Sequence, residues 1–114
     1  MALKVEPELR KAFQKYGFKA GFLKLSILKI VSLTPTHGYA LMKEIERLTE
    51  EDWRPSPGSI YPALQDLLKD ELIVSRKEGR RKIYEITPKG EQVLLIAVEH
   101  ASIALRHLNR LLSL

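Results

Sequence analysis

Positive charge is concentrated in one short stretch of this chain, because five of the seven residues from Arg76 to Lys82 are basic. Basic side chains gathered at one place neutralise phosphate groups and release the counterions held by a nucleic-acid backbone. The candidates for this chemistry are Lys77, Arg80, Arg81 and Lys82. Arg80 or Arg81 can instead enter a minor groove and sense its width. The alternative is a solvated charged turn without a ligand.

A second set of polar side chains precedes this stretch, namely Ser56, Ser59, Tyr61 and Gln65. At the N-terminal end of a helix, such groups can face base edges in a DNA groove. Gln65 can form two hydrogen bonds with one adenine, which is the geometry that discriminates between base sequences. Tyr61 can bond a phosphate through its hydroxyl, or its ring can fill the edge of the core. The alternative for Ser56 is a purely structural role as a helix cap.

Tyr39 and Lys43 form a third candidate pair, one helical turn apart. A helix that begins just before Tyr39 has an N-terminus that attracts phosphate, and Lys43 can add a contact to the backbone. His37 is expected to order the loop before this helix. His100 and His107 share one helix face, but two histidines without a nearby carboxylate or cysteine make a poor metal site. We therefore expect no metal and no cofactor.

A helix followed by a β-hairpin must position most of these residues. Ser56 and Pro57 are typical of a helix start, the serine as cap and the proline in the first turn. The apolar residues that follow at helical spacing are Ile60, Leu64, Leu67 and Leu68. Leu72 to Lys77 and Lys82 to Thr87 alternate and are β-branched, which predicts two strands joined by a turn at 78–81.

Pro62 lies inside the predicted helix. If the helix starts at Pro57, Pro62 removes a backbone hydrogen bond in the second turn. If the helix starts nearer Ser59, Pro62 is still in the first turn and costs little. A continuous helix is expected in both cases.

Two more helices are predicted before this unit and complete a three-helix core. The first covers Phe22–Leu33, and the second is capped by Thr36 and runs to about Thr49. Their buried candidates are Phe22, Leu25, Leu28 and Ile30 in the first helix and Leu41, Ile45 and Leu48 in the second. A further short helix is expected from Pro7 to Tyr16. Its apolar face, which needs a surface to bury against, is formed by Leu9, Phe13 and Tyr16.

The last helix is predicted to begin at Thr87 and Pro88, although Gly90 stands where a capping box would have glutamate. Its apolar residues alternate spacings of four and three, as in a heptad seam. They are Leu94, Val98, Ala101, Leu105, Leu108 and Leu112. Such a helix is longer than the small core can cover, so we expect it to pack against a second copy of the chain. The alternative is an amphipathic helix folded back on its own core.

The composition sets limits on the class of protein. The chain has 114 residues, which suits one compact unit, and a formal net charge of +5, which suits an anionic partner. It contains no cysteine, so disulfides and cysteine-ligated metals are excluded. The N-terminal sequence lacks the apolar run of a signal peptide, and no segment has the roughly 20 apolar residues that span a bilayer. A cytoplasmic protein without membrane contact is expected.

The predicted fold is mainly α with a small two-stranded β-hairpin: a winged helix-turn-helix followed by a C-terminal dimerisation helix. Residues 1–87 are expected to form the DNA-binding part, including the N-terminal helix, and residues 88–114 the dimerisation helix. In this layout the helix after Ser56 enters a DNA groove while the hairpin touches the neighbouring backbone.

Three separated motifs resemble the PadR family of bacterial and archaeal transcriptional regulators. They are THGYALMKEIE, SPGSIYPALQDL and RRKIYEITPKGEQVL, and they occur in the family's order. The resemblance covers about residues 22–95 and implies a homodimeric winged helix-turn-helix regulator of the compact subgroup with a single short C-terminal helix. Tyr61 matches the family's tyrosine in the recognition helix. Some small relatives sense flat aromatic compounds through a tryptophan on the last helix, but that helix has no aromatic residue here, so a small-molecule effector remains open.

We therefore expect a non-enzymatic, sequence-specific regulator that binds double-stranded DNA. It is expected to act as a homodimer on a pseudo-palindromic operator, as a repressor. No Ser-His-Asp arrangement or glycine-rich phosphate loop has a plausible setting in this chain. The alternative function is a winged-helix module that binds proteins and has no affinity for DNA.

Overall fold

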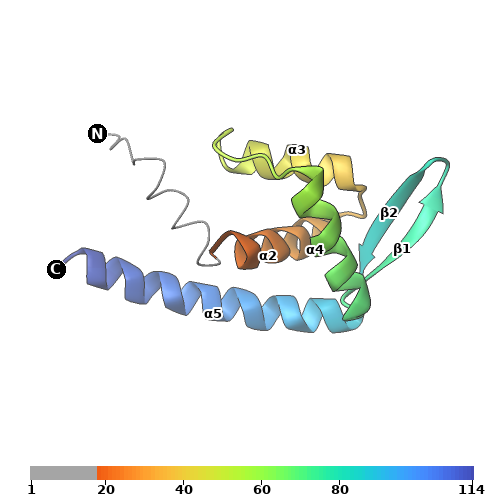
Figure 1. Ribbon diagram of the computed structural model, residues 1–114. Coiled ribbons are helices and arrows are strands. Elements are labelled where there is room, and N and C mark those ends of the chain that lie inside the picture. Colours follow the sequence, from red (N-terminus) through yellow and green to blue (C-terminus); the bar gives the residue numbers. More distant parts are fainter. Residues whose placement is uncertain (1–17) are drawn as a thin grey trace.

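A computed structural model describes residues 18–114 of the chain. The elements are α2 (Phe18–Leu33), α3 (Gly38–Leu48), α4 (Pro57–Lys69), β1 (Ile73–Glu78), β2 (Arg81–Ile86) and α5 (Pro88–Leu112), arranged as Figure 1 shows. The predicted fold class, mainly helical with one antiparallel hairpin, is confirmed. The predicted helix from Pro7 to Tyr16, with Leu9 and Phe13, lies outside the described residues.

Helix α2 occupies the centre of the molecule, with α3 and α4 on one side and α5 running alongside it (Figure 1). Apolar residues lie all around α2, which is typical of a helix covered by neighbours on several sides. Its innermost residue, Ile27, is fully buried together with Leu41 and Ile45 of α3 and with Ile60 and Leu64 of α4. These side chains form the core that fixes the positions of the three helices.

Two residues predicted to be buried are exposed. Phe22 and Leu48 keep 39% and 57% of their surface accessible, because both line an open apolar groove between α2, α3 and α5. The ring of Phe22 packs partly on Trp53, with 5.7 Å between centroids. Met42 of α3 is buried, although the sequence pattern had not placed it in the core.

The start of α3 also differs from the prediction. His37, and not Thr36, is the N-cap, and its Nδ1 accepts a hydrogen bond of 3.2 Å from the backbone N–H of Ala40. Thr36 instead forms an isolated β-bridge with Tyr84 of β2. The N–H of Tyr84 donates to the Thr36 carbonyl at 2.8 Å, and the N–H of Thr36 donates back at 3.2 Å. This pairing explains why Thr36 cannot serve as the cap.

Helix α4 starts at Pro57 and runs without a break through Pro62, which therefore lies in the second turn. Since proline has no N–H, the carbonyl of Gly58 receives no helical hydrogen bond from it. Ser56 is the N-cap residue, but the expected side-chain cap is absent. Its hydroxyl instead donates to that of Ser59, at 3.2 Å.

The end of α4 turns the chain into the hairpin. Glu71 has the left-handed φ of 61° that usually favours glycine at this position. Its N–H donates to the Leu68 carbonyl and that of Leu72 to the Leu67 carbonyl, both at 3.0 Å. This is the Schellman pattern of hydrogen bonds, and it directs β1 away from the helix axis.

The two strands form one antiparallel pair, from Ile73 opposite Ile86 to Glu78 opposite Arg81. Each strand is shifted by one residue toward the tip relative to the prediction, so the turn contains only Gly79 and Arg80. Gly79 has a φ of 63°, as the first central residue of a two-residue type II′ turn requires. We call residues 73–86 the wing.

Helix α5 is joined to the core at a close backbone contact. Thr87 caps it as predicted, since its Oγ1 accepts a hydrogen bond of 3.0 Å from the N–H of Gly90. The same hydroxyl donates to the Glu71 carbonyl at 2.7 Å. Gly90 sits directly against the Leu72 carbonyl, where a Cβ would overlap that oxygen and lie 2.7 Å from Cγ1 of Ile86. Glycine at this position is therefore required by the packing of α5.

In residues 18–114, no helix combines the length and apolar character needed to cross a membrane.

Gly90→Ala should lower the free energy of unfolding by about 2–3 kcal/mol, because the added methyl group meets backbone that cannot move independently. Gly21→Ala is the matched control. Gly21 lies in α2, and a methyl group added there would meet no described atom within 4 Å beyond its chain neighbours and its own helix backbone. The change should therefore stabilise the chain by roughly 0.5–1 kcal/mol. Urea unfolding of both variants measures the difference. Equal effects would show that the contact between Leu72 and residue 90 does not constrain the fold.

Candidate nucleic-acid interface

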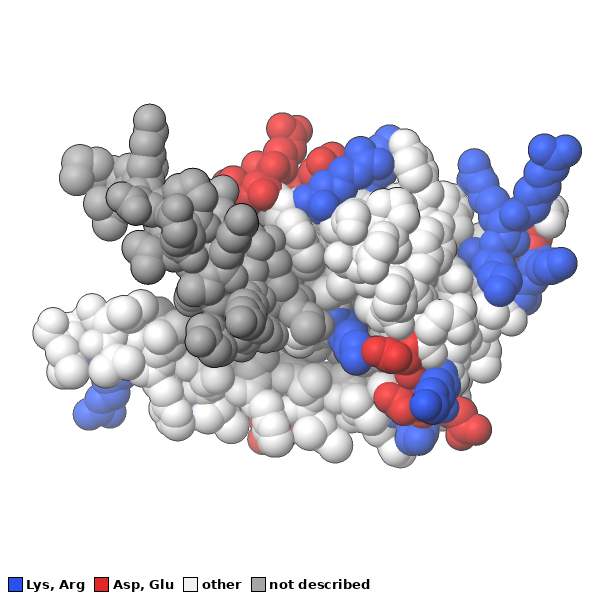
Figure 2. All heavy atoms as spheres, viewed as in Figure 1, with Lys and Arg blue, Asp and Glu red and all other residues white. Residues whose placement is uncertain are grey.

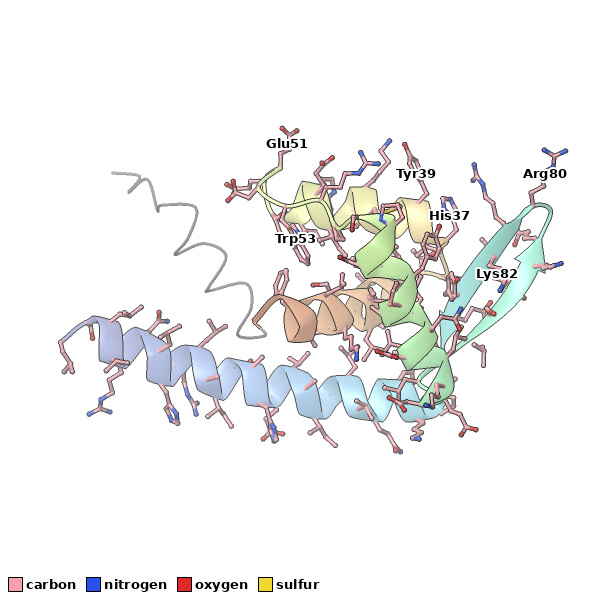
Figure 3. The ribbon with its side chains drawn as sticks, viewed as in Figure 1. His37, Tyr39, Glu51, Trp53, Arg80 and Lys82 are labelled. Atoms are coloured by element: carbon pink, nitrogen blue, oxygen red, sulfur yellow. The ribbon has the colours of Figure 1, made fainter. Side chains whose placement is uncertain are left out.

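The ten residues predicted to contact DNA are all exposed in the structure. They come from the start of α3, the start of α4 and the wing, and are Tyr39, Lys43, Ser56, Ser59, Tyr61, Gln65, Lys77, Arg80, Arg81 and Lys82. Figure 2 shows that lysine and arginine side chains gather on the wing, at the end of the molecule opposite the C-terminus. In Figure 3, Arg80 points outward from the hairpin tip.

The register of the wing places like charges together. Lys77 lies directly opposite Lys82, and like charges at directly opposed positions destabilise a strand pair. Arg76 is different, because its guanidinium is paired with the carboxylates of Glu78 and Glu85. Arg76 therefore links β1 to β2 through Glu85, while Lys77 and Lys82 have no acidic partner among residues 18–114.

A groove of about 380 Å³ runs between the wing and the helices. None of the described residues that line it is acidic, and its walls are formed by His37, Gly38, Tyr39, Tyr61, Arg80, Arg81, Lys82 and Tyr84. The bridge between Thr36 and Tyr84 creates this groove, because it fixes the start of α3 against β2. The groove thus joins residues that lie more than forty positions apart, such as His37 and Arg81.

His37 is a member of this surface that the sequence pattern did not assign to binding. Its Nε2 lies 3.1 Å from Nη1 of Arg81, and Figure 3 shows the imidazole between the start of α3 and the wing. The only sequence signal was its place before Gly38 and Tyr39, which predicted an ordered loop. Its proximity to Arg81 depends on the β-bridge, which could not be inferred from local sequence.

Tyr61 packs on the first residue of α3. A Cβ on Gly38 would come within 2.9–3.1 Å of the Tyr61 ring and hydroxyl, so the absence of a side chain at Gly38 makes room for that ring. The ring is nevertheless 44% exposed. It therefore lies at the edge of the core and also lines the groove, and its bond to a phosphate stays a prediction.

Tyr84 is a core residue, buried with only 3% of its surface exposed. Burial raises the pKa of its phenol, and the neighbouring Tyr61 adds to the rise. The cause is that a phenolate loses its hydration in the core.

Tyr39 carries two cations over its ring. Nζ of Lys43 and the guanidinium carbon of Arg54 both lie 5.6 Å from the ring centroid, within the range of cation–π attraction. Arg54 was not among the predicted site residues. Arg54 lies in the loop before α4 and reaches Tyr39 because α3 packs against α4. The spacing of residues in the sequence therefore gave no indication of this contact.

The outer face of α4 carries Gln65, which is exposed. The adjacent carboxylate of Asp66 is paired with Lys24 of α2 at 3.0 Å. This ion pair directs the negative charge of Asp66 toward α2 and leaves Gln65 beside a partly neutralised neighbour. The exposed hydroxyls of Ser56 and Ser59 complete the polar start of the helix.

Away from this surface, α5 has an apolar face that residues 18–114 cover only at its beginning. Leu94, predicted to contact a second copy, is buried in the core of its own chain with 7% exposed. Ala101 is half-buried, and the remaining predicted positions Val98, Leu105, Leu108 and Leu112 are exposed. Val98 and Leu105 also line the apolar groove of about 330 Å³ that Phe22 and Leu48 border. The uncovered seam therefore starts at Val98.

Comparison with known proteins identifies the family. Residues 27–95 match the model of the transcriptional regulator PadR-like family. This chain belongs to that family. The family is described as one of transcriptional regulators, and PadR-like regulators are not enzymes. The match includes α3, α4 and the wing, and it ends within the first part of α5.

Two curated relatives are similar to this chain. The chain is 46% identical over 78 residues to the transcriptional regulator YqjI of Escherichia coli, a match that covers 68% of this chain and 38% of YqjI. The chain therefore spans well under half the length of that relative. It is 36% identical over 81 residues to the transcriptional regulator Rv3488 of Mycobacterium tuberculosis, covering 68% of this chain and 73% of Rv3488.

Solved structures share the fold. A transcriptional regulator from Clostridium thermocellum superposes with a TM-score of 0.74 at 27% identity, covering 79% of this chain and 92% of that one. A PadR family regulator from Clostridium difficile gives a TM-score of 0.70 at 22% identity, covering 80% of this chain and 98% of that one. These similarities confirm the winged-helix fold of the PadR-like family.

The raised pKa of Tyr84 predicts a loss of stability at high pH. The folded chain holds the Tyr84 proton more tightly than the unfolded chain, whose tyrosine pKa is about 10. The resulting stabilisation of the fold is complete below that pH and is lost as pH rises through the pKa of the folded chain. Ultraviolet difference titration of wild type against Tyr84→Phe isolates this phenol. Its midpoint should lie above about pH 10, and Tyr61→Phe should move it downward. A midpoint at or below 10 would contradict the burial of the hydroxyl.

Proposed function

We propose that the chain is a homodimeric, sequence-specific DNA-binding repressor that acts on a pseudo-palindromic operator. The observation that carries this proposal is the surface on which exposed cations of the wing adjoin the polar start of α4, with no acidic residue among the described residues that line the groove. Lys77 and Lys82 face each other at a cost to the free hairpin. A phosphate backbone relieves that repulsion.

The two parts of this surface are proposed to do different work. Lys77, Arg80, Arg81 and Lys82 bind phosphates, which supplies affinity that depends on salt and not on sequence. Ser56, Ser59, Tyr61 and Gln65 lie on or beside the helix that enters the major groove, and Gln65 reads a base edge. Tyr39 and Lys43 contact the backbone next to α4, with Arg54 holding the Tyr39 ring from the side.

Residues 88–114 are proposed to form the dimerisation helix and residues 1–87 the DNA-binding part. Support comes from the exposed apolar seam of α5, since isolated apolar side chains are common on protein surfaces but a continuous stripe needs a covering surface. The seam is formed by Val98, Ala101, Leu105, Leu108 and Leu112. A dimer places two copies of α4 about one helical turn apart, roughly 34–36 Å.

The competing function is a winged helix that binds a protein and not DNA. The pairing of Arg76 with Glu78 and Glu85 shows that the hairpin can neutralise a cation internally, yet Lys77 and Lys82 lack such partners among the described residues. A polyanion accounts for this selective lack of pairing better than an apolar partner does. An acidic protein surface remains the alternative outcome of the binding tests.

Substitutions in the wing and in α4 should affect DNA binding differently. Arg80→Ala with Arg81→Ala should weaken binding to operator and random duplex alike, and should reduce the salt slope by about 0.9 for each phosphate that is no longer neutralised. Gln65→Ala should cost about 1–3 kcal/mol on the operator alone and leave the salt slope unchanged. Fluorescence anisotropy at several salt concentrations measures both.

The contrast between these variants decides the assignment of roles. Equal losses on operator and random DNA for Gln65→Ala would refute base reading by α4. Unchanged DNA affinity in the wing variant, together with loss of a protein complex, would support the competing function.

Leu105→Asp should convert the dimer into monomers, because it places a charge in the centre of the seam. Leu105 is 59% exposed in the single chain, so the change should leave the fold intact. Monomers should bind the operator roughly 10–100-fold more weakly, since two half-sites are no longer held together. Leu95→Asp is the matched control, because Leu95 is 72% exposed but lies off the seam. Sedimentation velocity that shows a monomeric wild type would refute the dimer.

A further inference from the structure

The imidazole of His37 and the guanidinium of Arg81 face each other across the groove. Nδ1 of His37 is occupied as the acceptor of the Ala40 N–H at 3.2 Å. A neutral imidazole carries one proton, so when Nδ1 accepts, the proton resides on Nε2. Nε2 is the atom that lies 3.1 Å from Nη1 of Arg81.

This contact cannot be a hydrogen bond while the cap is intact. A guanidinium offers only donors, so two N–H groups point into the same space. If Nε2 were instead to accept from Arg81, the proton would move to Nδ1 and the cap of α3 would lose its acceptor. The imidazole thus satisfies one of these partners but not both.

An anion beside the two groups gives both N–H groups an acceptor and so removes the conflict. One phosphate accepts from Nε2–H of His37 and from the guanidinium of Arg81, and arginine is well suited to this because its planar fork matches phosphate oxygens. Arg80 and Lys82 line the same groove, and no acidic residue of the described chain does. The surrounding charge therefore favours an anion over a neutral or cationic ligand.

We propose that His37 and Arg81 together bind one phosphate of the DNA backbone, which adds His37 to the DNA-binding residues. This inference rests on the proposed function. His37 couples the cap of α3 to phosphate binding. Because Nδ1 accepts from the helix, the proton is on Nε2, and Nε2 donates to the phosphate. The start of α3 and the wing are then held on the same phosphate.

The test is a double-mutant cycle in duplex binding. His37→Asn keeps a strong helix-capping side chain but lacks the second ring nitrogen, so it should bind duplex DNA roughly tenfold more weakly with an unchanged melting temperature. Arg81→Gln should weaken binding at least as much and reduce the salt slope. The double variant should bind duplex DNA only slightly more weakly than Arg81→Gln alone, because both substitutions remove contacts to the same phosphate.

Arg80→Gln is the matched control for the cycle. Arg80 is a neighbouring wing arginine that makes no side-chain hydrogen bond or ion pair within residues 18–114. The fold-loss of duplex affinity in Arg80→Gln should multiply with the fold-loss in His37→Asn when the two substitutions are combined. The shared phosphate contact would be refuted if His37→Asn bound duplex DNA within twofold of wild type. It would also be refuted if the affinity losses of His37→Asn and Arg81→Gln multiplied in the double variant. A wild type that binds no duplex at low salt would instead refute the proposed function itself.

Nitrogen NMR of the histidine ring tests the same site without substitution. The free protein should contain the Nε2–H form of His37, and the Nε2 signal should shift on saturation with duplex DNA. Inorganic phosphate at the same total phosphate concentration should leave it unchanged. An Nδ1–H form, an unresponsive Nε2, or an equal shift with inorganic phosphate would each overturn the assignment to a DNA phosphate.

Discussion

The proposed binding surface depends on the pair of backbone hydrogen bonds between Thr36 and Tyr84. They tie the loop before α3 to β2 and make the wing an extension of the helical core. Tyr84 and Ile73 are also buried in the core, so the bridge adds backbone pairing to a hairpin that already packs on the helices. With the bridge, His37, Tyr61 and the basic tip share one groove. A local pairing of two residues thus brings together parts of the site that are far apart in the sequence.

The basic residues of the wing differ in whether carboxylates of the hairpin neutralise them. Arg76 is neutralised by Glu78 and Glu85, while Lys77 and Lys82 oppose each other. A free hairpin gains from the first arrangement and loses from the second. Functional surfaces often retain interactions that weaken the fold locally, and this register is consistent with a site whose charges are matched only by a partner.

Local patterns predicted the elements well, and long-range packing explains what they missed. The spacing of Ile60, Leu64 and Leu67 correctly located α4, because helical periodicity reports burial directly. Thr36 and His37 are both able to cap a helix, so only the pairing of Thr36 with β2 decides between them. Leu48 and Leu94 follow the same apolar periodicity, yet one is exposed and the other buried. The difference depends on which other helices pack against each leucine, and a short stretch of sequence does not contain that information.

The central claim is that two copies of the chain hold one duplex through phosphates and base edges together. Sedimentation equilibrium with a labelled duplex from the upstream region of its own gene, repeated at several salt concentrations, tests this most directly. The account predicts two chains per duplex and a logarithmic affinity that falls linearly with the logarithm of salt concentration. One chain per duplex, or an affinity independent of salt, would contradict it.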